Sequence, residues 1–276
     1  MTSITKVATI ILNRNLPDVT DKLYNHIKKF DSKVSDIFII ESGSDSNNLS
    51  KNVTWHADWH EVKLNGLRYS RGINYGLSKL AEEKKFKNYD AFLFLTNDTE
   101  FENTPSVGKL AEIMSNHPRL GILSPCSKRW GEYLLLREKK IKYFWYIHNN
   151  AYMFRKSFIL DVMHSKPDYM NFLFDGNNFR GYGSEMEIIA KCYSNDWAAA
   201  ITSEVLVNEN ENYLLKQSDL IKTDSYEENM KLYLAEGKKW MKNKYGFDSK
   251  WSMQMYVKLF YDRFFDFYPE YMEYKI

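Results

Sequence analysis

Three short polar segments stand out because each follows directly on an apolar run of strand length. They are residues 13–15 (Asn-Arg-Asn), 41–45 (Glu-Ser-Gly-Ser-Asp) and 97–100 (Asn-Asp-Thr-Glu). Their amides, hydroxyls and carboxylates can all form hydrogen bonds to a polar ligand. Ligands of open α/β sheets bind at the carboxyl ends of the strands. These segments are therefore the first candidates for a binding site.

Two histidines, His56 and His60, have the H-x3-H spacing that suits a zinc site when both lie on one helix. No third ligand extends this pattern nearby, and the adjacent Trp55 and Trp59 indicate packing. We therefore expect these histidines to have a structural role rather than to bind zinc.

The elements that must position the polar segments alternate between apolar runs and helical patterns. A helix is predicted from Pro17, with apolar residues recurring on one face, and another begins at Ile73–Leu80. The βαβα order predicts an α/β fold, with a mostly parallel sheet flanked by helices on both faces. The predicted strands are Val7–Leu12, Ile37–Ile40, a segment near Glu61–Leu64, Ala91–Thr96, Leu120–Leu123 and Ala151–Phe154.

The composition is that of a globular protein, with 44% hydrophobic and 27% charged residues in 276 positions. A net charge of +2 gives no support to a nucleic-acid partner bound through bulk charge. No apolar run approaches the roughly 18 residues of a spanning helix. The first residues lead straight into a strand, so we expect no signal peptide, and the two cysteines fit a reducing cytosol.

Four segments resemble, in order, the motifs of the inverting family-2 glycosyltransferases of GT-A fold. Residues 7–15 resemble their first strand, and residues 39–45 resemble their second strand end, with Glu41 in place of the usual Asp. Residues 67–77 resemble their glycine- and asparagine-containing middle segment, and residues 94–99 resemble their metal motif. The resemblance covers roughly residues 6–210. It implies a GT-A-type nucleotide-binding sheet.

The resemblance also implies a nucleotide-diphospho-sugar donor whose charge is neutralised by a divalent cation, Mn²⁺ or Mg²⁺. Asp98 is the predicted metal ligand, and Glu100 either assists it or is a solvated loop acid. The alternatives remain plain turns for Asp98 and for residues 41–45, and solvated arginines at 68 and 71. The predicted donor contacts are Asn13, Asn15, Glu41, Ser44, Asp45, Arg68, Arg71, Asn74, Asn97 and Asp98.

An inverting transfer needs a base that accepts the proton of the acceptor hydroxyl. Glu185 occupies the position of the family's catalytic acid and is the predicted general base. Ser184 and Glu187 have the spacing of a capping box, which predicts a helix start at Glu185 and a structural role for Glu187. The helix dipole lowers the pKa of a first-turn acid, so a base here requires apolar or acidic surroundings.

Many relatives carry a His after the last strand, where this chain has Asn208. The metal prediction is weaker for this reason, unless Asn208 or Glu209 takes over as ligand. His148 precedes a strand that borders the acceptor site in the family and is expected either to touch the acceptor or to be structural. Asp175 and Glu187 are further candidates for acceptor contact or for support of the reacting groups.

We divide the chain into residues 1–215, the predicted catalytic domain, and residues 216–276, a helical aromatic-rich extension. Tyr226–Lys244 is predicted to be a helix with a basic end. The extension is expected to pack on the catalytic domain, to form a homodimer or partner interface, or to dock on a membrane surface. Acidic residues in the last stretch argue against membrane docking there.

The combined prediction is an inverting glycosyltransferase acting on a hydroxyl of a glycan or lipid-linked acceptor. The expected context is bacterial surface-polysaccharide synthesis in the cytoplasm, with peripheral contact at the inner face of the membrane as an option. One alternative is a catalytically degenerate GT-A domain that binds a glycan or a partner. A nucleotidyltransferase is the other, but residues 13–17 lack the glycines of a phosphate loop.

Overall fold

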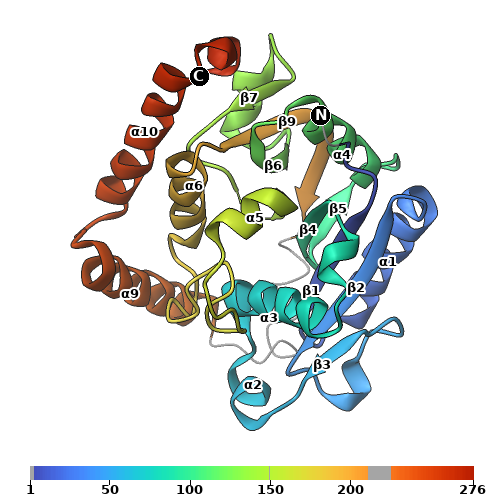
Figure 1. Ribbon diagram of the computed structural model, residues 1–276. Coiled ribbons are helices and arrows are strands. Elements are labelled where there is room, and N and C mark those ends of the chain that lie inside the picture. The colour runs from blue at the N-terminus through green and yellow to red at the C-terminus, as the bar shows by residue number, and fades with distance from the viewer. Residues whose placement is uncertain (1–2, 149, 211–224) are drawn as a thin grey trace.

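A computed structural model describes residues 3–148, 150–210 and 225–276 of the chain. It has an α/β architecture in which helices flank one twisted sheet (Figure 1). The strand order is β3-β2-β1-β4-β8-β6-β9-β5, and β7 pairs with β9. The predicted α/β fold is therefore confirmed.

The strands are short and, in the centre of the sheet, almost wholly buried. They are β1 (Val7–Asn13), β2 (Ser35–Ser42), β3 (Trp55–Ala57), β4 (Ala91–Thr96), β5 (Thr99–Phe101), β6 (Leu120–Cys126), β7 (Ile141–Tyr143), β8 (Ala151–Arg155) and β9 (Ala198–Glu209).

The helices lie between the strands and, in the last part of the chain, after them. They are α1 (Pro17–Asp31), α2 (His60–Asn65), α3 (Arg68–Glu82), α4 (Val107–Asn116), α5 (Lys156–Val162), α6 (Ser184–Ser194), α9 (Tyr226–Tyr245) and α10 (Lys250–Phe267).

The N-terminal half of the sheet is parallel and brings its polar strand ends to one edge. β1 pairs in parallel with β2 and with β4, so Asn13 lies beside Glu41 and Leu12 lies beside Thr96. β8 then runs antiparallel to both β4 and β6. The parallel prediction holds for β3, β2, β1 and β4, whereas β8 reverses the direction in the second half.

One predicted strand is wrong. The segment near Glu61–Leu64 belongs to helix α2, and the strand that pairs with β2 is β3, a few residues earlier. Val62 is the buried residue of this helix, and its carbonyl accepts a hydrogen bond from the Arg14 guanidinium at 2.9 Å. The apolar residues of this segment therefore belong to a short helix and not to a strand.

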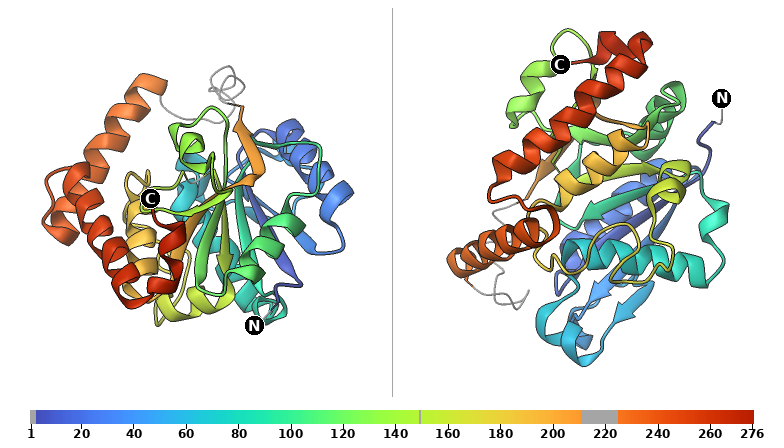
Figure 2. Two further views of the ribbon diagram at one scale, coloured as in Figure 1. Left: turned by 90° about the horizontal axis from the view of Figure 1, so that it is seen from above. Right: turned by 60° about the vertical axis from the view of Figure 1, so that its left-hand side comes forward.

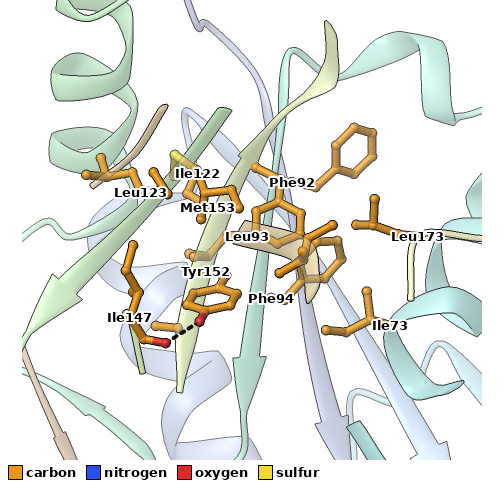
Figure 3. Packing of buried hydrophobic residues seen from close by; sticks show 14 of the residues in the cluster. Ile73, Phe92, Leu93, Phe94, Ile122, Leu123, Ile147, Tyr152, Met153 and Leu173 are labelled. Atoms are coloured by element: carbon orange, nitrogen blue, oxygen red, sulfur yellow. Dashed lines mark hydrogen bonds between the residues drawn. The ribbon is translucent and has the colours of Figure 1, made fainter. Parts of the chain in front are cut away.

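The core lies between the sheet and its flanking helices and is rich in aromatic rings (Figure 3). Phe94 and Phe154, on the neighbouring strands β4 and β8, meet edge to face with centroids 5.3 Å apart. The hydroxyl of the buried Tyr152 donates to the Ile147 carbonyl at 2.5 Å. Much of the high aromatic content is thus accounted for by packing.

The C-terminal helices lie against the rest of the chain. Both views in Figure 2 place α10 alongside α6. Met253, Val257 and Tyr261 of α10 are buried in the same hydrophobic cluster as the sheet. The predicted boundary at residue 215 falls outside the described residues. Among the described helices, none is both long and apolar enough to cross a membrane.

Candidate active site

The ends of β1, β2 and β4 are joined by a buried hydrogen-bond network around Glu41, which we call the strand-end cluster. Asn13 Nδ2 donates to both carboxylate oxygens of Glu41, at 3.1 and 2.9 Å. The Ser44 hydroxyl donates to Oε2 at 2.6 Å, and the Ser50 amide donates to Oε1 at 2.7 Å. Asn97 Nδ2 then donates to Asn13 Oδ1 at 2.8 Å.

Glu41 has no exposed surface, and each of its oxygens accepts two hydrogen bonds from the protein. The predicted contact of Glu41 with a nucleotide does not fit this geometry. Its carboxylate instead fixes Asn13 and, through it, Asn97. The longer side chain that replaces the usual Asp reaches the Ser50 amide, nine residues along the chain.

The neighbouring loop forms the more accessible part of this edge. The Asn15 amide donates to the Ser44 hydroxyl at 2.9 Å, and the Asp45 amide donates to Asn15 Oδ1 at 2.7 Å. Asn15 adopts a positive φ of 56°, which asparagine tolerates better than most residues. Asp45 is exposed, so of these predicted donor contacts it is the acid that a ligand can reach.

Asp98 follows β4 and is partly exposed. Its carbonyl accepts the Asn210 amide at 3.0 Å, and the next residue pairs with Glu209 across β5 and β9. No group of three His, Cys, Asp or Glu side chains that could hold a metal occurs within the described residues. Asp98 fits a Mg²⁺ or Mn²⁺ ion that takes one or two carboxylates and completes its shell with phosphate oxygens and water.

Positive charge gathers at the start of α3. Burial lowers the pKa of Arg14, and the nearby charge of Arg68 lowers it further. The guanidinium groups of Arg68 and Arg71 lie over the Phe179 ring at 5.6 and 4.7 Å. Arg71 also donates to the Gly176 carbonyl at 2.8 Å. Arg71 also pairs with Glu61 at 3.0 Å, and Arg14 donates to four backbone carbonyls, so these guanidinium groups already have partners in the protein. Their positive charge still favours an anionic ligand next to α3.

Asn74, on the same helix, does not face a ligand. It has no exposed surface, its Oδ1 accepts the amides of Leu173 and Phe174 at 3.0 Å, and its Nδ2 donates to the Phe174 carbonyl at 2.8 Å. Asn74 therefore fixes the backbone of the segment that leads to Asp175. The predicted contact of Asn74 with the donor does not fit this position.

Glu185 lies in the first turn of α6, within one residue of the predicted helix start, and its side chain is partly exposed. Burial raises the pKa of Glu185 above its ordinary value. Backbone amides of the helix start, Lys250 and His148 act in the opposite direction and do not cancel the effect. The carboxyl group is thus desolvated, although Glu185 as a whole residue keeps some exposed surface.

Aromatic side chains surround this carboxylate. Burial, and then the charge of Glu185, raise the pKa of Tyr69 and of Tyr233. The rings of Tyr182 and Tyr233 meet edge to face at 4.9 Å. Lys250, the first residue of α10, lies over the Tyr182 ring at 5.8 Å. The C-terminal helices therefore contribute directly to the surroundings of Glu185.

The predicted capping box is wrong. The N-cap of α6 is Gly183, with φ of 82°, and Ser184 is already inside the helix. Glu187 is buried, and its Oε1 accepts the Tyr245 hydroxyl at 2.5 Å and pairs with Lys244 at 2.7 Å. Its closest partners thus come from α9, and the one from its own helix, Lys191, lies 3.9 Å from Oε1.

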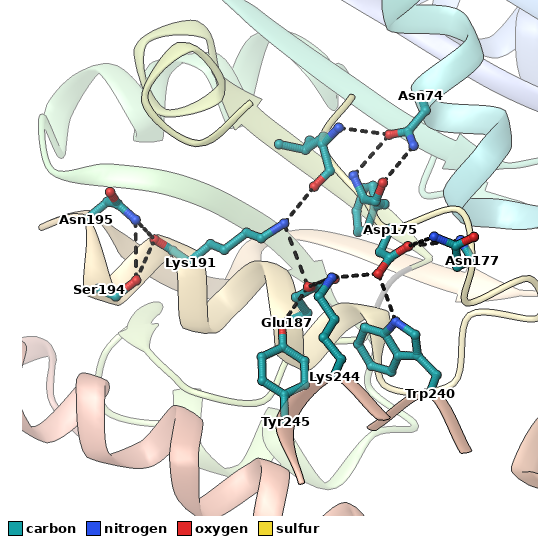
Figure 4. Close-up of polar contacts among 12 residues, drawn as sticks. Asn74, Asp175, Asn177, Glu187, Lys191, Ser194, Asn195, Trp240, Lys244 and Tyr245 are labelled. Carbon is teal, nitrogen blue, oxygen red and sulfur yellow. Dashed lines mark hydrogen bonds and ion pairs between the residues drawn. The ribbon is translucent and has the colours of Figure 1, made fainter. Parts of the chain in front are cut away.

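Asp175 is held by the same helix (Figure 4). Its Oδ2 accepts the Trp240 indole N–H at 3.0 Å and pairs with Lys244 at 2.6 Å. Burial alone would raise the pKa of Asp175, but these donors and the amide of Asn177 lower it to about 2. We call Asp175, Glu187, Trp240, Lys244 and Tyr245 the α9 anchor. Asp175 and Glu187 are thus structural acids in this arrangement.

Comparison with known proteins identifies the fold. The sequence matches no protein-family profile and no curated protein. Residues 1–349 of S. aureus TarS in complex with UDP align with a TM-score of 0.51 at 12% identity, over 95% of this chain and 72% of that chain. The fold is GT-A. Glucosyl-3-phosphoglycerate synthase from Mycobacterium tuberculosis, in complex with Mn²⁺, UDP-glucose and phosphoglyceric acid, aligns with a TM-score of 0.51 at 10% identity, over 85% of this chain and 79% of that chain.

On this GT-A fold, two predicted acceptor-side residues are engaged with neighbours. His148 Nε2 pairs with Glu132 at 3.2 Å, and its ring stacks on Trp130 with centroids 4.2 Å apart. Asn208 Oδ1 accepts the Ser127 hydroxyl at 3.2 Å. His148 stays within electrostatic range of Glu185, whereas Asn208 lies on β9 beside β5.

Sequence reasoning did not assign Tyr233, Lys244 or Lys250 to the site. Each comes from the C-terminal helices, where the sequence shows only a basic and aromatic run. Their roles depend on which face of the GT-A domain these helices cover. No local motif carries that information.

Proposed function

We propose that the chain is a metal-assisted inverting glycosyltransferase. It moves a hexosyl or deoxyhexosyl group from a nucleotide-diphospho-sugar to a hydroxyl of a glycan or lipid-linked acceptor. The observation that carries this proposal is Glu185, a partly exposed residue at the start of α6 whose desolvated carboxyl has a raised pKa. It supplies the base that the reaction needs, on a fold shared with nucleotide-sugar enzymes.

In the proposed step, the acceptor oxygen forms a bond to the anomeric carbon while its proton moves to the Glu185 carboxylate. The bond from that carbon to the diphosphate breaks, and the diphosphate leaves with the electron pair. A raised pKa suits Glu185 to this role, because a carboxylate of ordinary pKa is a weaker base near neutral pH. A bound cation would stabilise the leaving diphosphate.

The nucleotide and the cation are proposed to bind along the edge from Asp45 to Asp98. The cluster of Arg14, Arg68 and Arg71 supports an anionic ligand there. Because the described residues hold no group of three possible metal ligands, the cation is expected to bind together with the diphosphate rather than before it.

The biological context is proposed by analogy with the fold alone. It is bacterial surface-polysaccharide synthesis on the cytoplasmic side, with the C-terminal helices available for peripheral membrane contact or for a homodimer. Exposed apolar side chains on one side of α10, those of Trp251, Met255 and Leu259, support a contact surface of this kind.

A degenerate GT-A module that binds a glycan or a partner is the second candidate. The observation that favours it is Asn208, which stands where relatives carry a His and is bonded to Ser127. Such a module would lack turnover while keeping the fold. Retained binding of a nucleotide together with a metal would favour the enzyme.

A thermal-shift screen tests the proposal, with UDP, GDP, dTDP and CMP, each with and without Mn²⁺. One nucleotide is expected to raise the Tm by about 5 °C at hundredfold excess over its Kd, more with Mn²⁺ than without. Mn²⁺ alone is expected to leave the Tm unchanged.

Two variants locate the metal ligand. Asp98→Asn should lose the Mn²⁺-dependent part of the shift. Glu102→Gln, which changes an exposed acid just beyond β5 that pairs with Lys128, should keep it. A wild-type chain that responds to none of the nucleotides would overturn the proposed function. An unchanged Mn²⁺ effect in Asp98→Asn would remove Asp98 from the metal site.

A further inference from the structure

A pocket opens between helix α9 and residues 175–179, in the segment that leads to α6. Its volume is about 630 Å³, which lies within the range of small-ligand pockets. Asn177 and Phe179 line it on one side, and Lys239, Trp240 and Asn243 of α9 line it on the other. Asn177, Lys239 and Asn243 are exposed, so a ligand in solution can reach these side chains. We call this space the α9 pocket.

The acids that line the α9 pocket already have partners in the protein. Asp175 accepts the Trp240 indole N–H at 3.0 Å and pairs with Lys244 at 2.6 Å (Figure 4). Glu236 pairs with the Arg180 guanidinium. Neither carboxylate therefore needs a cation from a ligand. These contacts also join α9 to the opposite wall, which lowers the cost of ordering the pocket when a ligand binds.

Three polar side chains of the pocket remain available to a ligand. Lys239 and Asn243 form no hydrogen bond or ion pair with any residue that the structure describes. Asn177 Nδ2 donates to Asp175 Oδ1 at 3.0 Å, which leaves the Asn177 amide oxygen as an acceptor. Together, one ammonium group and two amides can both donate hydrogen bonds to a ligand and accept them from it. A group that does both, such as a sugar hydroxyl, matches this set.

The two aromatic side chains of the pocket, Phe179 and Trp240, add apolar surface on both walls. A sugar ring has apolar C–H faces and a rim of hydroxyls, so it suits a pocket that combines aromatic rings with a few hydrogen-bonding groups. A nucleotide or a phosphate group would need more positive charge. Of the two lysines that line the pocket, Lys244 is already paired with acids and only Lys239 is not. The lining therefore favours a neutral sugar.

The pocket lies beside the proposed reaction centre and not at it. Tyr233 is within electrostatic range of the Glu185 carboxylate, and Trp240 follows on the same helix, about 10 Å along its axis. On the opposite wall, the Arg71 guanidinium lies over the Phe179 ring at 4.7 Å. A ligand that extends from Glu185 along α9 would place a further unit in the pocket, away from its reacting hydroxyl.

We propose that the α9 pocket binds a neutral, non-reacting sugar unit of a glycan acceptor. Phe179 and Trp240 pack against the sugar ring, and Asn177, Lys239 and Asn243 form hydrogen bonds to its hydroxyls. This inference rests on the proposed function and deepens it, because it selects a saccharide chain among the proposed acceptors. It also gives the C-terminal helix α9 a part in substrate recognition.

Saturation-transfer difference NMR tests the pocket with four neutral disaccharides in the absence of nucleotide. They are maltose, cellobiose, lactose and N,N′-diacetylchitobiose, and at least one should bind the wild type. The double variant Lys239→Ala/Asn243→Ala removes two hydrogen-bonding groups and should weaken this binding about tenfold or more. Its Tm should match that of the wild type, because both side chains are exposed and have no polar partner among the described residues.

Lys238→Ala/Lys242→Ala is the matched control. Both lysines are exposed on the same helix, and neither lines the pocket. Lys242 pairs only with the exposed Asp248 among the described residues. This variant should bind the disaccharide with the affinity of the wild type.

Three results would overturn the inference. They are a wild type that binds none of the disaccharides, equal affinities in the wild type and Lys239→Ala/Asn243→Ala, and an equal loss in the control variant. The response of the wild type to nucleotides is measured separately by thermal shift. A retained response would confine the failure to the α9 pocket, whereas an absent response would contradict the proposed function itself.

Discussion

Glu41, in the strand-end cluster, and Glu185, in the first turn of α6, both have desolvated carboxyl groups, but the protein satisfies only the first with a full set of hydrogen bonds. Around Glu41, four hydrogen bonds from Asn13, Ser44 and Ser50 fill both carboxylate oxygens. At Glu185, burial raises the pKa of the carboxyl, and the donors near it do not cancel this effect. The comparison teaches that a buried carboxylate with a full set of partners holds the fold together, whereas one without them keeps the raised pKa that suits a base.

Glu41→Gln is expected to have the largest effect on stability. The Ser50 backbone amide can only donate, so the glutamine must keep its oxygen toward Ser50 and its NH2 group then faces Asn13 Nδ2, which is also a donor. To avoid two donors facing each other, the side-chain amide of Asn13, and then that of Asn97, must flip. The free energy of unfolding should fall by about 3 kcal/mol, measured by urea denaturation. Glu100→Gln, at a more exposed acid of the same edge, should change it by less than about 0.5 kcal/mol. Equal stability of the two variants would show that the cluster is not structural.

Lys244→Met should have the next largest effect. It leaves the acids Asp175 and Glu187 of the α9 anchor without their cation and should cost about 2 kcal/mol. This is less than for a wholly buried pair, because the side chain of Lys244 is 36% exposed. Lys242→Met is the control on the same helix, since its pair with Asp248 is mostly exposed.

The loss in Lys244→Met should depend on pH. The pKa of Asp175 is lowered from 3.8 to about 2 in the folded protein, so its stabilisation is complete above pH 3.8 and is lost as the pH falls toward 2. The difference between wild type and variant should shrink over the same range. A constant difference down to pH 2 would show that the anchor does not act through the charge of Asp175.

Glu185→Gln should produce a smaller change of opposite sign. Removing a desolvated charge should raise the Tm by about 2–4 °C at pH 8. Because the folded pKa of Glu185 is raised, the gain should disappear as the pH falls through that pKa. Glu187→Gln, two residues away, should lower the Tm, because that acid is satisfied by Lys244 and Tyr245. If both variants changed the Tm in the same direction, the proposed difference between Glu185 and Glu187 would be wrong.

The sequence is sufficient to predict the strands that carry the polar edge and the start of α6. The run from Ala91 to Thr96 is buried in the centre of the sheet, and Glu185 lies at a helix start, because these features depend on local periodicity. The α2 segment was predicted wrongly because a short apolar run does not distinguish one helical turn from a strand.

The partner that each acidic or amide side chain binds could not be predicted from the sequence. Asn74 is bound to a segment 99–100 positions away, and Glu187 is bound to Tyr245, 58 positions away. Such partners depend on how the elements pack, and side-chain type alone does not specify them. The place of Ser184 inside α6 was missed for a related reason, because serine at a helix start ordinarily indicates capping.

The most direct test of the central claim compares turnover with binding in Glu185→Gln. Release of nucleotide diphosphate from the sugar donor should fall by about 10²–10⁴-fold in the presence of an acceptor, while the Kd for that donor with Mn²⁺ stays within twofold of the wild-type value. In the wild type, kcat/KM should decline toward acid pH with a pKa above the ordinary 4.5 of glutamate. Wild-type turnover in Glu185→Gln would contradict the assignment of the base.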